Sequence, residues 1–123
     1  MYIAIDFNSD EAIYLQLCNQ IIFQIATEQI KEGESLPSVR QLADTIGINM
    51  HTVNKAYSVL REQGYIKLDR RHGAVIAVDM DRLLALSELS DALRGIIARA
   101  MCRNVSAEEI HMLVDDIIRE FNS

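Results

Sequence analysis

The stretch from Leu36 to Val78 constrains the fold more than any other part of this 123-residue chain. Ser38 followed by Gln41 is a capping-box pattern, which satisfies free backbone amides at the start of a helix. Gly47 lies where a helix commonly ends on a left-handed residue, and Asn49 can cap the helix that follows. The spacing therefore predicts two short helices joined by a tight turn.

An apolar stripe marks the second of these helices. Apolar residues recur there at i, i+3, i+4 and i+7, which places them on one helix face: Val53, Ala56, Tyr57 and Leu60. After Gly64, two short apolar runs flank the charged segment 69–73, as expected for a β-hairpin. Helix, turn, helix and hairpin in this order are typical of a winged helix-turn-helix, in which the hairpin forms the wing.

The opposite face of the second helix carries polar side chains. At 100° per residue, His51, Lys55 and Ser58 project away from the apolar stripe, and Thr52 and Asn54 flank them. These side chains can hydrogen-bond to base edges or phosphates, and asparagine suits a bidentate contact with adenine. A solvated surface on a small domain explains the same pattern, so the helix alone leaves both interpretations open.

The charge distribution bears on this choice. Arg70, Arg71 and His72 lie between the two predicted strands, where a wing touches phosphate or the minor groove. The whole chain has a net charge of −6, but six basic and three acidic residues give segment 35–73 a local charge of +3. A DNA-binding surface needs a local positive potential, which the net charge does not set. The wing therefore favours DNA contact.

The motifs of this stretch resemble a known family. Leu-Pro-Ser-x-Arg-x-Leu-Ala, then Gly-Ile-Asn-x-x-Thr-Val-x-Lys-Ala-Tyr-x-x-Leu, then Gly-Tyr-Ile is similar to the DNA-binding domain of GntR-family bacterial transcription regulators. The match runs from about Ile13 to Val78, and the short C-terminal region resembles the YtrA-type subfamily. Two features depart from that pattern. Met50 stands where the subfamily often has proline, and the wing has only Gly73, where a second glycine two residues on is common.

The resemblance implies double-stranded DNA as the partner. It places Arg40 against DNA from the start of its helix and Gly73 in the wing. The residues it places at the reading end of the recognition helix are Asn49, His51, Thr52 and Asn54. Together with the exposed face and the wing, the predicted DNA-binding residues are Ser38, Arg40, Asn49, Met50, His51, Thr52, Asn54, Lys55, Arg70, Arg71, His72 and Gly73.

The residues before this stretch predict a strand and a long helix. The apolar run from Tyr2 to Ile5 is expected as an edge strand beside the wing. An apolar residue at every fourth position predicts a helix from Ala12 to Lys31 that Gly33 ends: Ile13, Leu17, Ile21 and Ile25. This helix is expected to support the core, with Tyr14 assigned to the core or to a solvated face.

Residues 79–123 predict two amphipathic helices, of which the first has about 24 residues. Two such helices cannot bury their apolar faces by themselves. The economical arrangement packs them against the same pair from a second copy, which gives a symmetric homodimer. A small apolar ligand between the helices is the alternative use of these faces. The predicted dimer contacts are Leu83, Leu86, Leu89, Leu93, Ile96, Ile97, Ile110, Leu113, Val114 and Ile117.

The expected fold class is mainly α with a small β wing (α+β). A winged helix-turn-helix DNA-binding domain is expected at residues 1–78, followed by a two-helix dimerisation region at 79–123. The expected function is a sequence-specific transcriptional regulator, a homodimeric repressor that binds a two-fold symmetric operator. The alternative is a winged helix that contacts proteins without binding DNA. Whether a small-molecule effector exists stays open.

Other functional classes find little support in the sequence. It has no Gly-rich phosphate loop, no cofactor or metal-ligand cluster and no nucleophile beside a base, so an enzyme is not expected. No apolar run approaches the roughly 18 residues of a membrane span, and the N-terminus lacks a basic secretory signal. We therefore expect a cytoplasmic protein in which Cys18 and Cys102 are reduced and buried.

Overall fold

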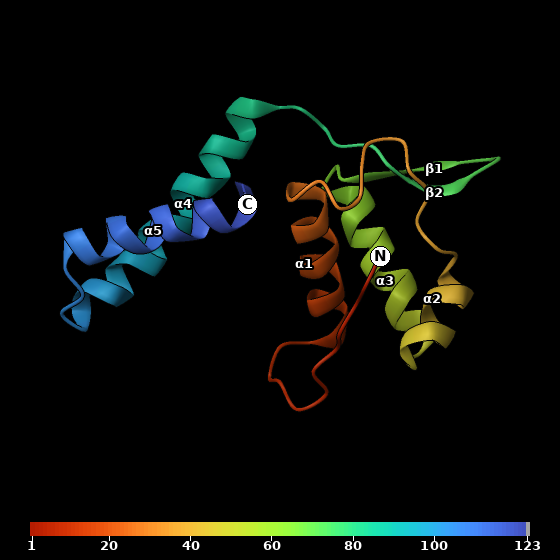
Figure 1. Cartoon of the computed structure of the whole chain (residues 1–123), viewed down its shortest axis with the longest axis horizontal. Coiled ribbons are helices and arrows are strands. Elements are labelled where there is room, and N and C mark those ends of the chain that lie inside the picture. Colours follow the sequence, from red (N-terminus) through yellow and green to blue (C-terminus); the bar gives the residue numbers. More distant parts are fainter. Residues whose placement is uncertain (123) are drawn as a thin grey trace. The chain divides into compact units, whose positions relative to one another are not determined.

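The computed structural model describes residues 1–122, which form five helices and a two-stranded antiparallel sheet. The predicted fold class, mainly α with a small β wing, is confirmed. The chain divides into an N-terminal unit, Met1–Asp79, and a C-terminal unit, Met80–Ser123. The elements in Figure 1 are α1 (Ile13–Ala26), α2 (Val39–Ile46), α3 (Met50–Glu62), β1 (Ile66–Asp69), β2 (Gly73–Ile76), α4 (Arg82–Cys102) and α5 (Ala107–Asn122).

The helix boundaries of α2 and α3 follow the predicted capping residues. The Ser38 hydroxyl accepts a hydrogen bond from Gln41 N, and the Gln41 side chain accepts one from Ser38 N, both at 3.1 Å. Gly47 ends α2 in the left-handed region with a φ of 70°. Asn49 caps α3, because its Oδ1 accepts a hydrogen bond from His51 N at 2.7 Å. These local signals therefore set the helix-turn-helix geometry.

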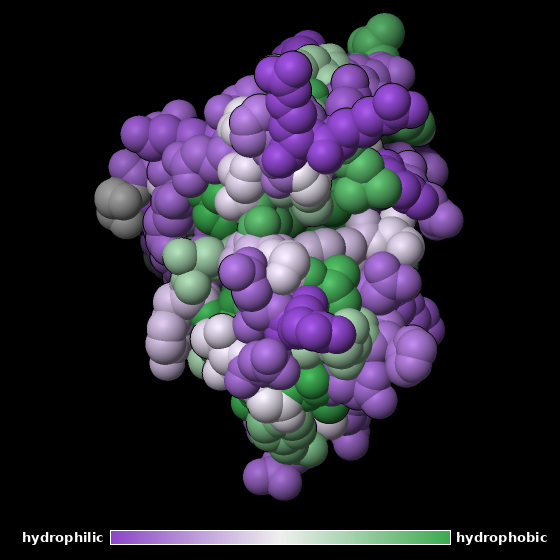
Figure 2. Space-filling view, turned by 90° about the vertical axis from the view of Figure 1, so that its right-hand side faces the viewer, coloured by the Kyte–Doolittle hydropathy of each residue, from purple (hydrophilic) through white to green (hydrophobic). Residues whose placement is uncertain are grey.

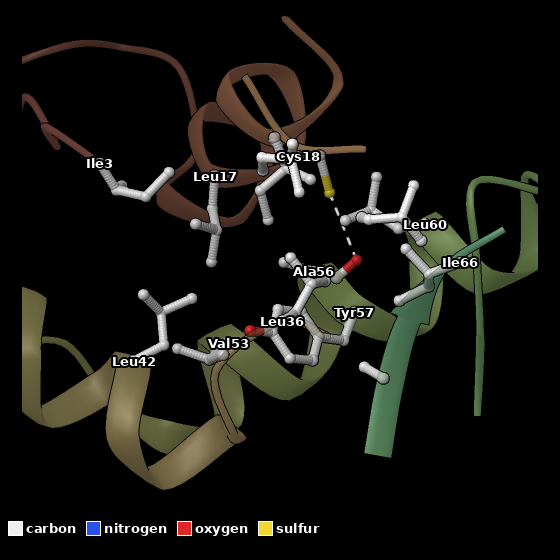
Figure 3. Packing of buried hydrophobic residues seen from close by; sticks show 14 of the residues in the cluster. Ile3, Leu17, Cys18, Leu36, Leu42, Val53, Ala56, Tyr57, Leu60 and Ile66 are labelled. Carbon is white, nitrogen blue, oxygen red and sulfur yellow. Dashed lines mark hydrogen bonds between the residues drawn. The ribbon is translucent and has the colours of Figure 1, made fainter. Parts of the chain in front are cut away.

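The core of the N-terminal unit forms where α1 and α3 pack together, as Figure 3 shows. Leu17 and Ile21 of α1 meet Val53 and Leu60 of α3, and all four side chains are fully buried. Burying one such side chain stabilises the fold by about 1.5–3 kcal/mol. The thiol of Cys18 donates to the Ala56 carbonyl at 3.4 Å, and burial raises its pKa. The predicted supporting role of α1 is thereby confirmed.

Strand β2 of the wing is hydrogen-bonded along both of its edges. In the β1–β2 hairpin Ile66 pairs with Ile76 and Asp69 pairs with Gly73. On the other edge, Leu36 N donates to Ala74 O and Ile76 N donates to Glu34 O, each at 2.8 Å. The segment that leads into α2 is therefore hydrogen-bonded to the wing, which fixes the wing relative to the helix-turn-helix.

The expected edge strand from Tyr2 to Ile5 is wrong. This arm is extended but joins no sheet, and glutamine amides of α1 supply the partners that a strand would otherwise provide. The rise over four helical residues, about 6 Å, is close to that of two extended residues, about 6.6 Å. Glutamines spaced by four therefore meet every second residue of the arm: Gln16 bonds Asp6, Gln20 bonds Ala4 and Gln24 bonds Tyr2.

The first helix is also shorter than predicted, since α1 ends at Ala26 rather than near Lys31. The Thr27 hydroxyl donates to the Phe23 carbonyl at 2.9 Å, and Glu28 adopts a positive φ of 60°. The chain then turns back, which brings Ile30 into the core. Ile30 is thus a core residue that a turn, rather than a continued helix, buries.

The C-terminal unit consists of α4 and α5, and α4 has 21 residues rather than about 24. Asp81 caps α4 by accepting a hydrogen bond from Leu84 N at 3.1 Å. Ser106 and Glu109 form a second capping box. No described side chain of α4 or α5 is buried. The expected burial of Cys102 is therefore wrong, since this residue is exposed.

None of the helices in residues 1–122 has the length and apolar character that a membrane span requires.

Gly64 and Gly33 offer a matched test of packing at the end of the wing. Both have a left-handed backbone, with φ of 84° and 85°, but a Cβ on Gly64 would lie 2.9 Å from Asp79 Cβ, whereas Gly33 has open space. We expect Gly33→Ala to lower the free energy of unfolding by about 1–2 kcal/mol through backbone strain. Gly64→Ala should cost about 1–3 kcal/mol more, because the added methyl overpacks the site. Urea denaturation measures both, and equal losses would contradict this account of Gly64.

Candidate DNA-binding surface

The exposed side of α3 forms the centre of the candidate surface. The stripe that the sequence predicted as apolar faces the core and is buried: Val53, Ala56, Tyr57 and Leu60. On the opposite side His51, Asn54 and Lys55 are exposed, and Thr52 and Ser58 are half-buried. Packing the apolar stripe against α1 and α2 therefore directs the polar side of α3 outward.

Arg40 lies in the first turn of α2, and its side chain is exposed. The start of α2 is tied to α3, because the Tyr57 hydroxyl donates to the Pro37 carbonyl at 2.7 Å. Burial raises the pKa of Tyr57 above its ordinary value, so the phenol stays protonated as the donor. Ser38, which follows Pro37, is exposed and caps α2. The hydrogen bond from Tyr57 therefore ties the start of α2, where Arg40 lies, to α3.

The two asparagines of the candidate surface differ in what they can offer. The side-chain oxygen of Asn49 is occupied by the cap of α3, which leaves mainly its NH₂ group as a donor. The Asn54 side chain is exposed and forms no hydrogen bond within residues 1–122. Its amide can therefore both donate and accept, as a bidentate contact with adenine requires. Met50, which is 43% exposed at the first position of α3, offers apolar contact.

A hollow of about 80 Å³ lies along the seam between α3 and the wing. Asn54, Ser58 and Arg61 line it from α3, and Ile66 and Leu68 line it from β1. Arg61 is exposed and adds a positive charge at this seam, yet it is absent from the predicted set. Its spacing from Asn54 and Ser58, at i+7 and i+3, is the signal that identifies it.

The tip of the wing is organised by Asp69. Its Oδ1 accepts hydrogen bonds from Arg71 N at 2.7 Å and His72 N at 3.3 Å, and it lies 3.4 Å from His72 Nδ1. The Arg71 amide first, and then the His72 side chain, hold the pKa of Asp69 below its ordinary value. Arg70 and Arg71 are exposed, and Gly73 starts β2 with a φ of 70°. Sequence reasoning missed the organising role of Asp69.

The Lys55 side chain reaches from the exposed side of α3 toward α1. Its Nζ is 4.1 Å from the centroid of the Tyr14 ring, a cation–π distance. Tyr14 packs against the core through its partly buried ring, whereas Lys55 is exposed. The sequence pattern predicts Tyr14 in the core or on a solvated face, and it carries no signal for the pairing with Lys55.

The predicted DNA-binding residues all lie in the same unit of the chain. All twelve predicted DNA-binding residues belong to the N-terminal unit, and all except the half-buried Thr52 are exposed. Figure 2 views the molecule from the side of α2 and the wing, where hydrophilic side chains cover most of the surface and smaller hydrophobic areas lie between them. The arrangement offers hydrogen-bond donors, acceptors and cations around one exposed helix.

Residues 13–76 match the family described as bacterial regulatory proteins, gntR family. The protein belongs to the GntR family. Along 118 residues it is 32% identical to the HTH-type transcriptional repressor YtrA of Bacillus subtilis, covering 94% of this chain and 91% of that protein.

Two solved structures share the fold of this chain. A transcriptional antiterminator from Listeria monocytogenes has a TM-score of 0.89 and 32% identity, covering 100% of this chain and 94% of that chain. YtrA from Sulfolobus acidocaldarius, a GntR-family transcription factor, has a TM-score of 0.59 and 40% identity, covering 98% of this chain and 100% of that chain.

Membership settles the general function. GntR proteins are DNA-binding transcriptional regulators, and this protein is one of them. The resemblance seen in the sequence is confirmed, and so is the winged helix-turn-helix. The relatives are regulators rather than enzymes.

The turn of this GntR wing gives a pH-dependent prediction. Because the folded pKa of Asp69 is lowered, its hydrogen bonds stabilise the turn above the ordinary aspartate pKa of about 3.9 and are lost as the pH falls through the lower folded value. The NMR shift of the Arg71 amide should follow this titration, with a midpoint below the ordinary value.

Asp69→Asn is the matched control, because it keeps an oxygen acceptor but has no carboxyl to titrate. The Arg71 amide should then lose its response to acid while its shift at neutral pH stays close to that of the wild type. An Arg71 amide that does not respond to acid in the wild type would contradict the role given to Asp69.

Proposed function

We propose that this protein is a homodimeric, sequence-specific repressor that binds a two-fold symmetric operator. In this proposal residues 1–78 form the DNA-binding domain and residues 79–123 form the dimerisation region. The observation that carries the dimer is the uncovered apolar surface of α4 and α5. The similarity to a relative named as a transcriptional repressor supports the direction of regulation.

Residues 80–122 of the C-terminal unit include no buried side chain, so they form no core of their own. Leu83 is 78% exposed and Leu89 is 54% exposed, although leucine is normally among the buried residues. Leucines and isoleucines left in water lose the burial that would stabilise the fold by about 1.5–3 kcal/mol each. Of the ten predicted dimer contacts, seven are exposed and three are half-buried: Leu83, Leu86, Leu89, Ile96, Leu113, Val114 and Ile117, then Leu93, Ile97 and Ile110.

An apolar hollow of about 600 Å³ runs along α4. Leu86, Leu89, Leu93, Ile97 and Met101 line it, with few polar side chains among them. In our proposal a helix of the second copy fills this hollow. A small apolar effector is the competing occupant, and it would act by changing the spacing of the two DNA-binding units.

A two-fold dimer presents two copies of α3 to the same face of DNA. Half-sites are then expected about 34 Å apart, or a multiple of that distance. We propose that His51, Thr52 and Asn54 enter the major groove and read bases. Arg40 would contact the backbone or an outer base, and Arg70 to Gly73 would meet the adjacent minor groove or phosphates. Occupying the operator in the bacterial cytoplasm would block transcription.

Selection of bound sequences from a random DNA pool tests this function. The wild type should enrich a two-fold symmetric motif at moderate salt. A variant with Arg40→Ala and Asn54→Ala should lose the motif, because both side chains are proposed to contact DNA. Both are exposed and neither is part of the core, so the variant should still fold. Phe7→Ala, another exposed position, is a control that should keep the motif. A wild type that enriches no sequence would overturn sequence-specific binding.

Charged substitutions on α4 test the dimer. Leu86→Asp and Leu89→Asp together should convert the protein to a monomer in sedimentation at micromolar concentration, because burying an unpaired carboxylate is costly. The monomer should bind a single half-site only weakly. Phe7→Asp places the same charge at an exposed apolar position of the N-terminal unit and should leave the dimer intact. A monomeric wild type, or a doubly substituted variant that stays dimeric, contradicts this interface.

A further inference from the structure

The ammonium group of Lys55 lies where the exposed side of α3 borders α1. At 100° per residue, His51, Lys55 and Ser58 all lie on the exposed side of α3, but the Lys55 side chain reaches toward α1, where its ammonium lies over the Tyr14 ring. The middle of a recognition helix faces base edges, whereas its margins face the two sugar–phosphate backbones. The position of the Lys55 ammonium, beside α1, therefore suits a phosphate rather than a base.

Tyr14 restricts where the Lys55 ammonium can go. The ring is anchored, because Tyr14 is in the first turn of α1 and packs against the core. The ammonium lies over this fixed ring at 4.1 Å, although the lysine stem has four rotatable bonds and is exposed to solvent. The contact uses one side of the ammonium and leaves N–H donors directed away from the ring.

We infer that Tyr14 is a positioning residue for DNA binding, which holds the Lys55 ammonium ready to contact a phosphate beside the major groove. A lysine that is already held loses less conformational freedom when it binds the phosphate. This inference rests on the proposed operator binding, and it adds α1 to the elements that support the DNA-binding surface.

A double-mutant cycle with Tyr14→Leu and Lys55→Met tests the inference. Holding one flexible side chain in place before binding corresponds to a factor of about 2–5 in affinity, and a dimer contains the pair twice, so Tyr14→Leu should weaken operator binding about 4–25-fold. In the Lys55→Met background the same substitution should change affinity less than about twofold. Tyr14→Phe keeps the ring and should bind like the wild type.

The type of DNA contact has its own readout. Lys55→Met should weaken binding to operator and to unrelated DNA by similar factors, and it should lower the slope of log affinity against log salt by about 2 for the dimer. Asn54→Ala is the matched control on the same helix, because losing a base contact should weaken operator binding alone. A loss confined to the operator in Lys55→Met would overturn the phosphate contact.

The outcomes separate this inference from the function beneath it. If the wild type prefers no DNA sequence, the proposed operator binding itself fails. If the wild type binds its operator but Tyr14→Leu has no effect, tightens binding or weakens it equally with and without Lys55, the positioning role is overturned. A loss that persists without Lys55 would show that Tyr14 acts only through the fold.

Discussion

The packing of α3 against α1 is the interaction on which the rest of the N-terminal unit depends. Val53 and Leu60 on one side of α3 are buried against Leu17 and Ile21. Because a helix has only one such apolar stripe, burying it leaves the polar side of α3 exposed. The same packing brings Tyr14 of α1 beside Lys55 of α3. The core and the DNA-binding surface are therefore two sides of one helix.

The two units of this GntR protein differ in how far they bury their apolar side chains. In the N-terminal unit, hydrogen bonds from Tyr57 to the chain before α2 and from segment 34–36 to β2 join the helices and the wing around one core. In the C-terminal unit, α4 and α5 leave large apolar side chains in water. The first unit is complete in one chain, and we propose that a second copy completes the other.

Some features required only local information and were predicted correctly. A capping box at Ser38, a left-handed Gly47 and a cap at Asn49 each depend on residues within four positions of one another. The apolar stripe of α3 depends only on helical period. Family motifs cover the same residues, so pattern and resemblance agreed on the winged helix-turn-helix.

The sequence by itself determined the helix-turn-helix, the wing and the exposed residues of α3, because capping and periodicity act over a few residues. Only the tertiary structure decided how distant segments meet. It placed the arm from Tyr2 against three glutamines of α1, it ended α1 early so that Ile30 reaches the core, and it set Lys55 over Tyr14. These outcomes depend on side chains far apart in the chain, whose contacts no local pattern records.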